Sequence, residues 1–337
     1  MIVTDLVKHK LFTVILITTA SFFSQRIVKG EQTIPIRSSG QIQISQSQKG
    51  MSIQQHRDKI LSGPYGSTSI TDLIQLLTEI PGGPEIHQIF QTMAVRKKEA
   101  LPIIKQKLRT GTMWEKHMLT KFLQYCPWPE VHAELASVAR DSGQHWLCRQ
   151  GALYALGELG DSTAGPEILP ILSEPNCPRG VQLVAISTLA RIGYRQAAST
   201  INIFTKHEDV HIRLFAHRAL AEFGEPVDRQ FLLSALDDKN YIVREEACGA
   251  LAAVEGEDIT QRLQYVAGYD FHESVRTAAR IGLLERQLKG RSSAEKLDIL
   301  RKAMASPERR TAPWIIRTIL NKCGPEGRAF VEQLSMR

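Results

Sequence analysis

A helical pattern of small and branched residues returns every 31 to 33 positions, and this period limits the fold more than any other feature. It is clearest at Ala152, Leu156 and Leu159, where i, i+4, i+7 spacing places three apolar side chains on one helix face. The remaining occurrences, weaker at both ends, are Leu119, Leu123, Cys126; Ala185, Leu189, Ile192; Ala216, Leu220, Phe223; Ala247, Leu251, Val254; Ala279, Leu283; and Ala312, Ile316, Ile319. A fixed period of this length predicts a stack of similar units rather than one closed globule.

A mostly basic column stands three residues before each triplet. Its members are Lys116, Arg149, Gln182, Arg213, Arg244, Arg276 and Arg309. Turn-forming residues with an acid, such as Asp209 and Asp238, precede several of them, and an aspartate at a helix start can accept hydrogen bonds from free backbone N–H groups. Gly160, Gly193 and Gly224 follow triplets, where glycine ends a helix in a left-handed turn. Each triplet therefore marks a helix with a defined start and end.

A second set of apolar patterns lies between the triplet helices. We expect these second helices at Pro129–Asp141, Gly165–Leu172, Pro226–Leu236 and Glu257–Ala267, an earlier pair at Ile70–Glu79 and Pro84–Met93, and a final capping helix near Pro325–Leu334. No strand pattern interrupts them, and aromatic residues are only 7% of the chain, which disfavours a β-sandwich or barrel. The sequence predicts an all-α fold, an α-solenoid or superhelix of about eight stacked helical hairpins.

The repeat unit resembles a known family. The segment Asp238–Leu251 follows the pattern Asp-x-x-x-x-Val-Arg-x-x-Ala-x-x-Ala-Leu and is similar to a HEAT repeat, closest to the short bacterial type called phycobilisome-lyase-like. The resemblance covers roughly residues 95–322. It implies a binding scaffold, because such solenoids usually serve that purpose. Chromophore lyases carry similar repeats, although this chain has no motif for handling a chromophore.

The first residues are interpreted as a leader rather than as part of the fold. Lys8 and Lys10 precede the apolar run Leu11–Phe23, which is too short to span ~30 Å of hydrocarbon comfortably. Residues 1–30 are therefore a signal peptide or an N-terminal anchor, and we expect export to the bacterial periplasm or beyond. The Gln- and Ser-rich residues 31–68 are expected to form a flexible linker. Residues 69–337 would then form the solenoid.

Charge and cysteine content exclude some classes of function. The formal net charge is +7, and without the leader, which carries +3, it falls to +4, so nucleic acid is not an expected partner. Residues 286–337 hold twelve Lys or Arg against five acids, a basic C-terminal cap that could bind an anionic surface or be a solvated helix face. The five cysteines show no metal or redox spacing, and Cys126 and Cys148 fit buried packing positions.

One short motif suggests metal chemistry. His207, Glu208 and His211 satisfy HExxH, in which two histidines one helical turn apart bind zinc and the glutamate activates water. The repeat register instead places Asp209 at the start of a helix over Val210–Phe223, so the two histidines would straddle that start. These three residues are thus a weak candidate metal site, and we expect no metal and no cofactor.

Two His-Glu pairs of the sequence resemble a feature of another HEAT family. His207-Glu208 and His272-Glu273 resemble the iron-binding pairs of the deoxyhypusine hydroxylases. In that family the pair should follow the basic column within the second helix of a hairpin. Neither pair does so here, and the resemblance fails in every repeat.

Two further columns are candidates for binding. The basic column could be an anion-binding ladder, but its place beside the turns favours a structural ladder of cross-repeat hydrogen bonds formed by Arg149, Arg213, Arg244 and Arg276. Two positions after the first triplet residue, about 200° around the helix, stand Lys121, Tyr154, Ser187, Arg218, Gly249, Ile281 and Trp314. This row would face the concave groove, and Lys121, Tyr154, Ser187, Arg218 and Trp314 are its predicted partner-binding residues.

These patterns together predict an exported, non-catalytic scaffold that binds a protein or peptide in the groove of a HEAT-like solenoid. Two alternatives stay open. One is a metal-dependent hydrolase or lyase built on the repeats, and the other is a binder of an anionic surface through residues 286–337. Membrane contact is expected only if the leader is uncleaved, and the pattern predicts no oligomeric state.

Overall fold

The computed structural model describes residue 58, residues 60–80 and residues 83–305. In that part of the chain every regular element is a helix and there is no strand. The described residues form two compact units, one made of those up to residue 107 together with residues 292–305, and the other of residues 108–291. Several predicted features lie outside the described residues: the leader 1–30, linker residues 31–57, Arg309, the triplet Ala312, Ile316, Ile319, Trp314 and the helix near Pro325–Leu334.

The first unit contains the early helical pair. Its described helices are α3 (Ile70–Glu79), α4 (Pro84–Val95), most of α5 (Lys97–Thr110), which runs on into the second unit, and α17 (Ser293–Ala305). α3 packs on α4, and it begins where the Ser69 side chain accepts a hydrogen bond from the backbone N–H of Asp72. Arg96 donates to the carbonyls of Gly66 and Thr68, which holds the turns before α3 against the helical pair.

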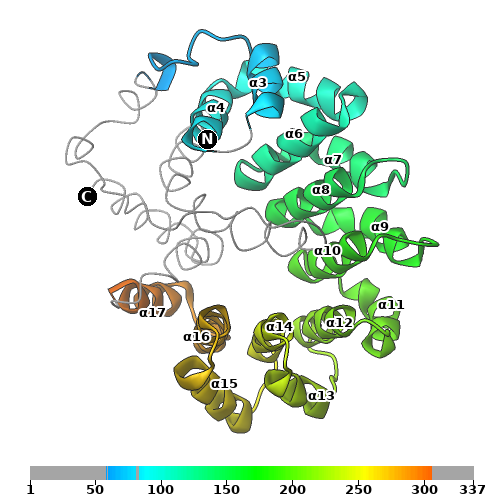
Figure 1. The fold of residues 1–337 in the computed structure, drawn as a ribbon, viewed down its shortest axis with the longest axis vertical. Coiled ribbons are helices and arrows are strands. Elements are labelled where there is room, and N and C mark those ends of the chain that lie inside the picture. The colour runs from blue at the N-terminus through cyan, green and yellow to red at the C-terminus, as the bar shows by residue number, and fades with distance from the viewer. Residues whose placement is uncertain (1–57, 59, 81–82, 306–337) are drawn as a thin grey trace. The chain divides into compact units, whose positions relative to one another are not determined.

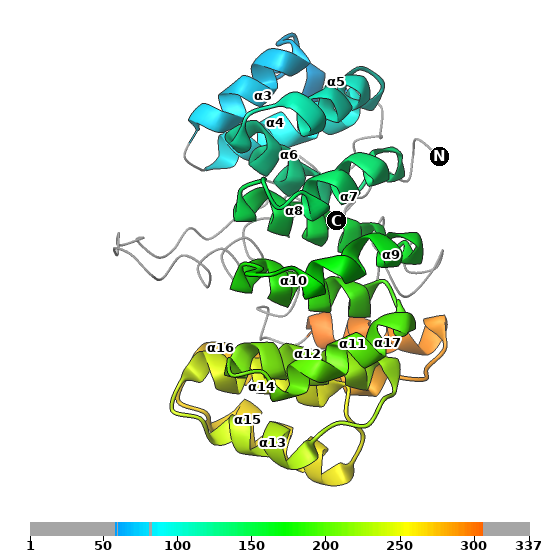
Figure 2. The same ribbon diagram turned by 90° about the vertical axis from the view of Figure 1, so that its right-hand side faces the viewer.

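The second unit has two layers of helices (Figure 1). The layer on the inner side of its arc consists of α6 (Met113–Tyr125), α8 (Trp146–Leu159), α10 (Arg179–Arg191), α12 (Val210–Phe223), α14 (Tyr241–Ala252) and α16 (Glu273–Leu288). Each of these helices packs on the next one, and Figure 2 shows α6, α8, α10 and α12 following one another along the stack. These are the triplet helices, so the predicted period is the period of the inner layer.

The outer layer is made of shorter pieces, several of them 3-10 turns. They are η2 (Pro129–Val131), α7 (His132–Arg140), η3 (Ser162–Ala164), α9 (Gly165–Ile168), η4 (Leu169–Ser173), η5 (Arg195–Ala197), α11 (Ala198–Ile203), η6 (Phe204–Lys206), α13 (Arg229–Ser234), η7 (Ala235–Asp237) and α15 (Glu257–Tyr269). Each outer helix packs on the inner helix that follows it, which makes one hairpin. α13 begins later than the predicted Pro226 because Asp228 caps it by accepting from the N–H of Phe231.

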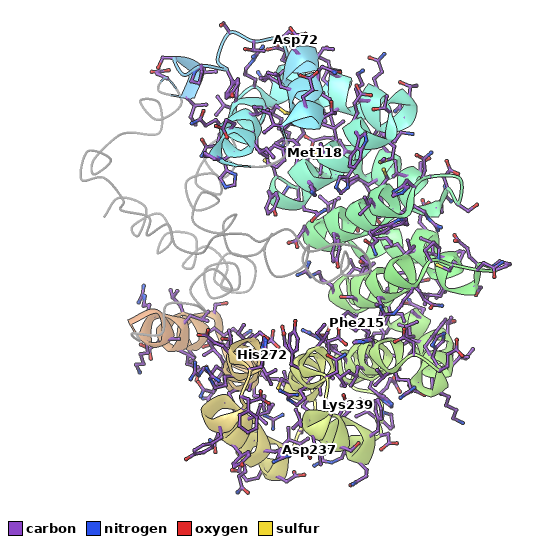
Figure 3. The ribbon with its side chains drawn as sticks, viewed as in Figure 1. Asp72, Met118, Phe215, Asp237, Lys239 and His272 are labelled. Atoms are coloured by element: carbon purple, nitrogen blue, oxygen red, sulfur yellow. The ribbon has the colours of Figure 1, made fainter. Side chains whose placement is uncertain are left out.

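Figure 3 shows the side chains of the two layers, and most of the triplet side chains belong to the buried core. Ala185, Ala247 and Leu251 are fully buried, whereas Leu159 and Leu283 are half-buried. Small residues allow the helices of the inner layer to approach each other closely. A Cβ atom added to Gly151 in α8 would lie 2.1 Å from Oγ1 of Thr120 in α6, so the contact between these helices requires glycine. The predicted all-α solenoid is confirmed for this unit.

Capping follows the predicted register with one correction. Asp209 is the N-cap of α12 and accepts from the N–H of His211, and Gly160 and Gly224 end their helices with φ of 67° and 79°. At α14 the N-cap is Asn240 instead of an aspartate. Asp238 lies two residues earlier and accepts from the N–H of Asn240, so it stabilises the turn rather than the helix start.

Candidate partner-binding face

The predicted partner-binding row lies on consecutive helices of the inner layer. Its described members are Lys121 on α6, Tyr154 on α8, Ser187 on α10, Arg218 on α12, Gly249 on α14 and Ile281 on α16. All six are half-buried, whereas the residues two positions before them are fully buried. The row therefore turns away from the space between the layers, as a 200° offset requires. We call this surface the inner face.

Arg218 is held across two helices of the inner face. Its Nε donates to Oε1 of Glu222, one turn later on α12, at 3.0 Å. Its Nη1 reaches Gly249 on α14, where an added Cβ atom would lie only 2.8 Å from that nitrogen. The glycine in the row thus makes room for the guanidinium group of the preceding row member.

A second column of side chains flanks this row and was not singled out from the sequence. It stands six positions after the first triplet residue and consists of Tyr125, Glu158, Arg191, Glu222, Ala253 and Glu285. Arg191 Nη1 donates to Glu158 Oε1 at 2.6 Å, which links α10 to α8. Extending the repeat register by one more turn would have found this column, because its members keep the same period.

The charges of the two columns interact beyond the bonded pairs. Arg191 lies in the electrostatic field of Arg218, and also in the field of the acids Glu222 and Glu285. Arg191 on α10 and Arg218 on α12 are each hydrogen-bonded to a carboxylate. This stretch of the inner face is therefore close to neutral, with opposite charges placed in alternation.

The first helix of the inner layer differs from this arrangement. His117 and Lys121 stand one turn apart on the half-buried stripe of α6, and the ring of Trp114 meets that of His117 edge-on at 6.0 Å. Burial, helped by the positive charge of Lys121, lowers the pKa of His117 to about 4. Burial also lowers the pKa of Lys121. At neutral pH this part of the face carries the lysine charge beside a neutral imidazole.

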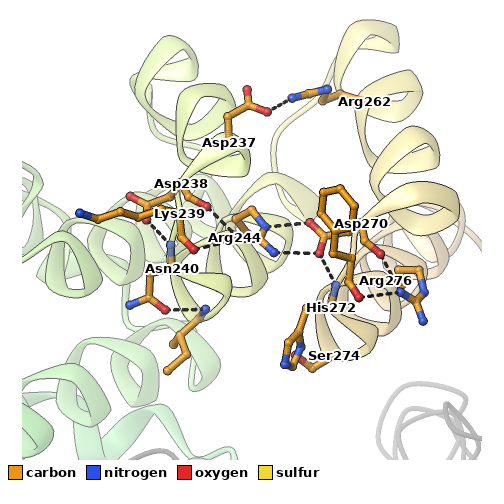
Figure 4. Close-up of polar contacts among 12 residues, drawn as sticks. Asp237, Asp238, Lys239, Asn240, Arg244, Arg262, Asp270, His272, Ser274 and Arg276 are labelled. Carbon is orange, nitrogen blue, oxygen red and sulfur yellow. Dashed lines mark hydrogen bonds and ion pairs between the residues drawn. The ribbon is translucent and has the colours of Figure 1, made fainter.

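The arginine ladder binds the turns of the stack (Figure 4). Arg213 Nη1 donates to the carbonyl of His207 at 2.7 Å, Arg244 Nη1 to that of Asp238 at 2.9 Å, and Arg276 Nη1 to that of Asp270 at 2.6 Å. In each case the acceptor lies six residues before the arginine. The repeated geometry satisfies carbonyls of the turn that precedes each inner helix.

Two ladder arginines also reach an acid of the following repeat. Arg244 binds Asp270, 26 residues later, through Nε and Nη2 at 2.7 and 2.9 Å. Arg149 binds both carboxylate oxygens of Glu174, 25 residues later, at 2.6 and 2.7 Å. Arg149 is almost fully buried, and its Nε donates to the carbonyl of Ala139 rather than to a carbonyl six residues back.

Asp270 has the most perturbed environment of the ladder acids. Burial alone would raise its pKa, but hydrogen bonds from Arg244 and from the backbone N–H of His272 outweigh burial and hold the pKa of Asp270 below its ordinary value. The carboxylate is therefore stabilised in its charged form by groups of two consecutive repeats.

The residues of the HExxH motif do not converge. His207 lies before α12 and its Nδ1 accepts from the N–H of Asp209 at 3.0 Å, while His211 lies inside the helix with Nδ1 2.6 Å from Oε2 of Glu246. The carbonyls of His207 and Glu208 accept from Arg213. Among the residues that the structure describes, no group of three or more His, Cys, Asp or Glu is placed to hold a metal ion.

Three of the described cysteines are buried, and several described basic residues near the C-terminal end bind other groups of the chain. Cys126, Cys148 and Cys248 are buried free thiols, and burial raises the pKa of Cys148 to about 11. Of the basic residues 286–337 the structure describes those up to 305. Arg286 donates to the carbonyl of Gly256 at 2.8 Å, and other residues of this stretch form ion pairs within the chain.

A polar hollow of about 420 Å³ lies on the outer layer between α13 and α15. It is lined by Gln230, Leu233, Ser234, Asp237, Asp258 and Arg262. Asp237 is paired with Arg262 across the hollow, as Figure 4 shows, and Asp258 is bound by Arg229 at 2.8 Å. Its charges are satisfied within the chain, so the hollow offers less to a charged partner than the inner face does.

The repeated hairpins, the buried triplets and the arginine ladder agree with comparisons to known proteins. A family model for HEAT repeats matches residues 165–252 and 199–284. This chain contains HEAT repeats.

Two solved structures are similar to parts of this chain. The complex of CpcE and CpcF of phycocyanin lyase from Nostoc sp. PCC7120 is 19% identical with a TM-score of 0.50, and the match covers 71% of this chain and 94% of that one. Human deoxyhypusine hydroxylase in complex with glycerol is 18% identical, covering 81% and 99%, with a TM-score of 0.29. No curated protein sequence matches the HEAT-repeat protein. Within its described residues, no helix combines the length and hydrophobicity needed to span a membrane.

Proposed function

We propose that this HEAT-repeat protein is an exported, non-catalytic scaffold that binds a protein or peptide along the inner face of its second unit. One observation carries the proposal. Consecutive inner helices present a half-buried row, with Tyr154 and Arg218 among its members, in an order set by the repeat. Stacked repeats create extended binding surfaces, and tyrosine and arginine are common anchors at protein interfaces.

The chemistry of the inner face supports binding rather than catalysis. Arg191 and Arg218 are hydrogen-bonded to Glu158 and Glu222, so these charged groups already hold one another in place. Paired charges of this kind serve better as fixed polar contacts for a partner.

The similar phycocyanin lyase structure is a complex of two chains, which agrees with a protein partner for this fold. Cell fractionation of the tagged protein tests export directly, and recovery in the cytoplasmic fraction with the leader intact would refute export.

Affinity capture from the native envelope fraction tests the binding face. The bait would be the full chain and a double variant, Tyr154→Ala with Arg218→Ala. The matched control is Tyr265→Ala with Arg262→Ala on α15 of the outer layer, where the guanidinium carbon of Arg262 lies 5.5 Å from the ring centre of Tyr265. Wild type and control should recover the same protein, and the inner-face variant should lose it.

Recovery of the same protein by the inner-face variant would refute the assignment of the binding face. Thermal denaturation of all three baits checks that the losses are not due to unfolding.

Metal analysis tests the alternative that the protein is a metal-dependent hydrolase. Stoichiometric zinc in the purified protein that is lost in the His211→Ala variant would replace the scaffold proposal with a metalloenzyme.

A further inference from the structure

Lys121 is the exceptional cation of the inner face. Arg191 and Arg218 each have a carboxylate within hydrogen-bonding distance, at 2.6 and 3.0 Å. Lys121 is half-buried in the same row as Arg218, but no ion pair or hydrogen bond joins it to another residue in the described part of the chain. A cation removed from water without a counter-charge is destabilising, and an incoming anion would relieve that cost.

The surroundings of Lys121 make it a site rather than an isolated surface lysine. His117 lies one helical turn before it, in contact with the ring of Trp114, and contributes no positive charge at neutral pH because its pKa is about 4. Trp114 is 52% exposed and stands about two turns before Lys121 on the same face of α6, so an exposed apolar side chain shares that face with the lysine. Tyr154 occupies the same row position on α8, the adjacent helix.

We propose that the partner of the inner face carries a glutamate or aspartate side chain whose carboxylate binds the ammonium group of Lys121. This inference rests on the proposed function, because it names the chemistry of one contact made by that partner. A carboxylate matches the uncompensated positive charge of Lys121, and the neutral stretch over α8 to α12 offers an acidic residue no comparable contact.

The row geometry also fixes the spacing of the partner's next contact. Neighbouring packed helices lie about 10 Å apart. An extended chain advances ~3.3 Å per residue, so the side chain that meets Tyr154 should be roughly three residues from the acid. An aromatic or aliphatic side chain would suit the tyrosine ring. The bound segment is thus an acid separated by about two residues from an apolar residue.

Selection from a phage-displayed library of random peptides tests this inference with a defined probe. The folded full chain would be the target, alongside Lys121→Met, which keeps an unbranched side chain of similar length, and Lys121→Arg, which keeps the charge. Wild type and Lys121→Arg should enrich peptides with the acid and apolar spacing described above. Lys121→Met should enrich peptides that lack the acid.

The strongest selected peptide is then compared with its Glu→Gln or Asp→Asn counterpart by titration calorimetry. A charge-assisted contact predicts about tenfold weaker binding of the amide peptide to wild type and an unchanged affinity for Lys121→Met. Peptides that bind the inner face without any acidic preference would overturn the inference and leave the proposed function standing. Failure of all three proteins to enrich any peptide would count against both.

Discussion

Arg244 and Asp270 join consecutive repeats through two parallel hydrogen bonds, while the same guanidinium holds the carbonyl of Asp238 in its own turn. The carbonyl of Asp270 in turn accepts from Arg276, the next member of the ladder. Neighbouring turns are therefore connected by a chain of side-chain and backbone contacts. In a stack where each hairpin touches only its neighbours, such contacts contribute directly to the coupling between repeats.

Replacing Arg244 with alanine should destabilise the solenoid. The Asp270 carboxylate, only 8% exposed, would lose its charged partner, and the carbonyl of Asp238 would lose a donor. We expect a loss of about 2 to 4 kcal/mol and a fall in Tm of roughly 5 to 10 °C in thermal denaturation. The control is Arg262→Ala, whose partner Asp237 is 68% exposed. That change should cost less than about 1 kcal/mol. Unchanged stability of Arg244→Ala together with lost anion binding would reassign the ladder to ligand binding.

The same ion pair predicts a loss of stability in acid. The pKa of Asp270 in the folded chain lies below its ordinary value of 3.8, so the unfolded state binds its proton first as the pH falls. The stabilisation is complete above the ordinary pKa and is lost as the pH falls through the folded pKa. Urea denaturation of Asp270→Asn at a series of pH values should show a smaller decline below about pH 4 than wild type. Parallel declines would show that another carboxylate is responsible.

His117 predicts a second, milder window of pH dependence. Its pKa falls from an ordinary 6.5 to about 4 on folding, so the unfolded state binds the extra proton between these values. Stability should decrease by on the order of 2 to 3 kcal/mol as the pH falls through that window. His117→Gln cannot take up the proton, and its urea midpoint should change less than that of wild type between neutral pH and pH 4. An identical slope for both proteins would contradict the burial of His117.

Two glycine substitutions should separate binding from stability. Gly249→Ala places a Cβ atom against the mobile end of Arg218, which can move aside, and alanine favours a helix. We expect unchanged or slightly higher Tm and weaker capture of the inner-face partner. Gly165→Ala instead meets the ring of Tyr194 at 2.1 Å, and overpacking of this kind costs about 1 to 3 kcal/mol. Calorimetry and affinity capture on both variants distinguish these outcomes, and a lower Tm for Gly249→Ala than for Gly165→Ala would contradict the contacts described.

The architecture was predictable because it depends on a period. Ala247 and Leu251 recur in register and are buried as expected, since a stack repeats the same environment in every hairpin. Details that depend on the conformation of a single turn could not be predicted from the period. The exchange of Asp238 for Asn240 as the cap of α14 depends on where one backbone N–H points, which the period does not encode.

The candidate partner-binding face was likewise predictable only where it depends on the period. The row containing Tyr154 and Arg218 follows from helical geometry alone, whereas the pairing of Glu158 with Arg191 joins residues 33 positions apart. Such a pair can be recognised from the sequence only by extending the register to a further column. The lack of a carboxylate partner for Lys121 could not be predicted from the sequence, because it depends on where the acidic side chains lie in the folded chain.

Site-specific photo-cross-linking tests the central claim most directly. A benzophenone-bearing amino acid in place of Tyr154 would lie on the inner face, and the same amino acid in place of Tyr269, which is 72% exposed on α15, would lie on the outer layer. After irradiation of cells that make the full chain, the inner position should give one discrete adduct with a protein or peptide, and the outer position should not. Adducts of equal yield at both positions, or at the outer position alone, would contradict binding along the inner face.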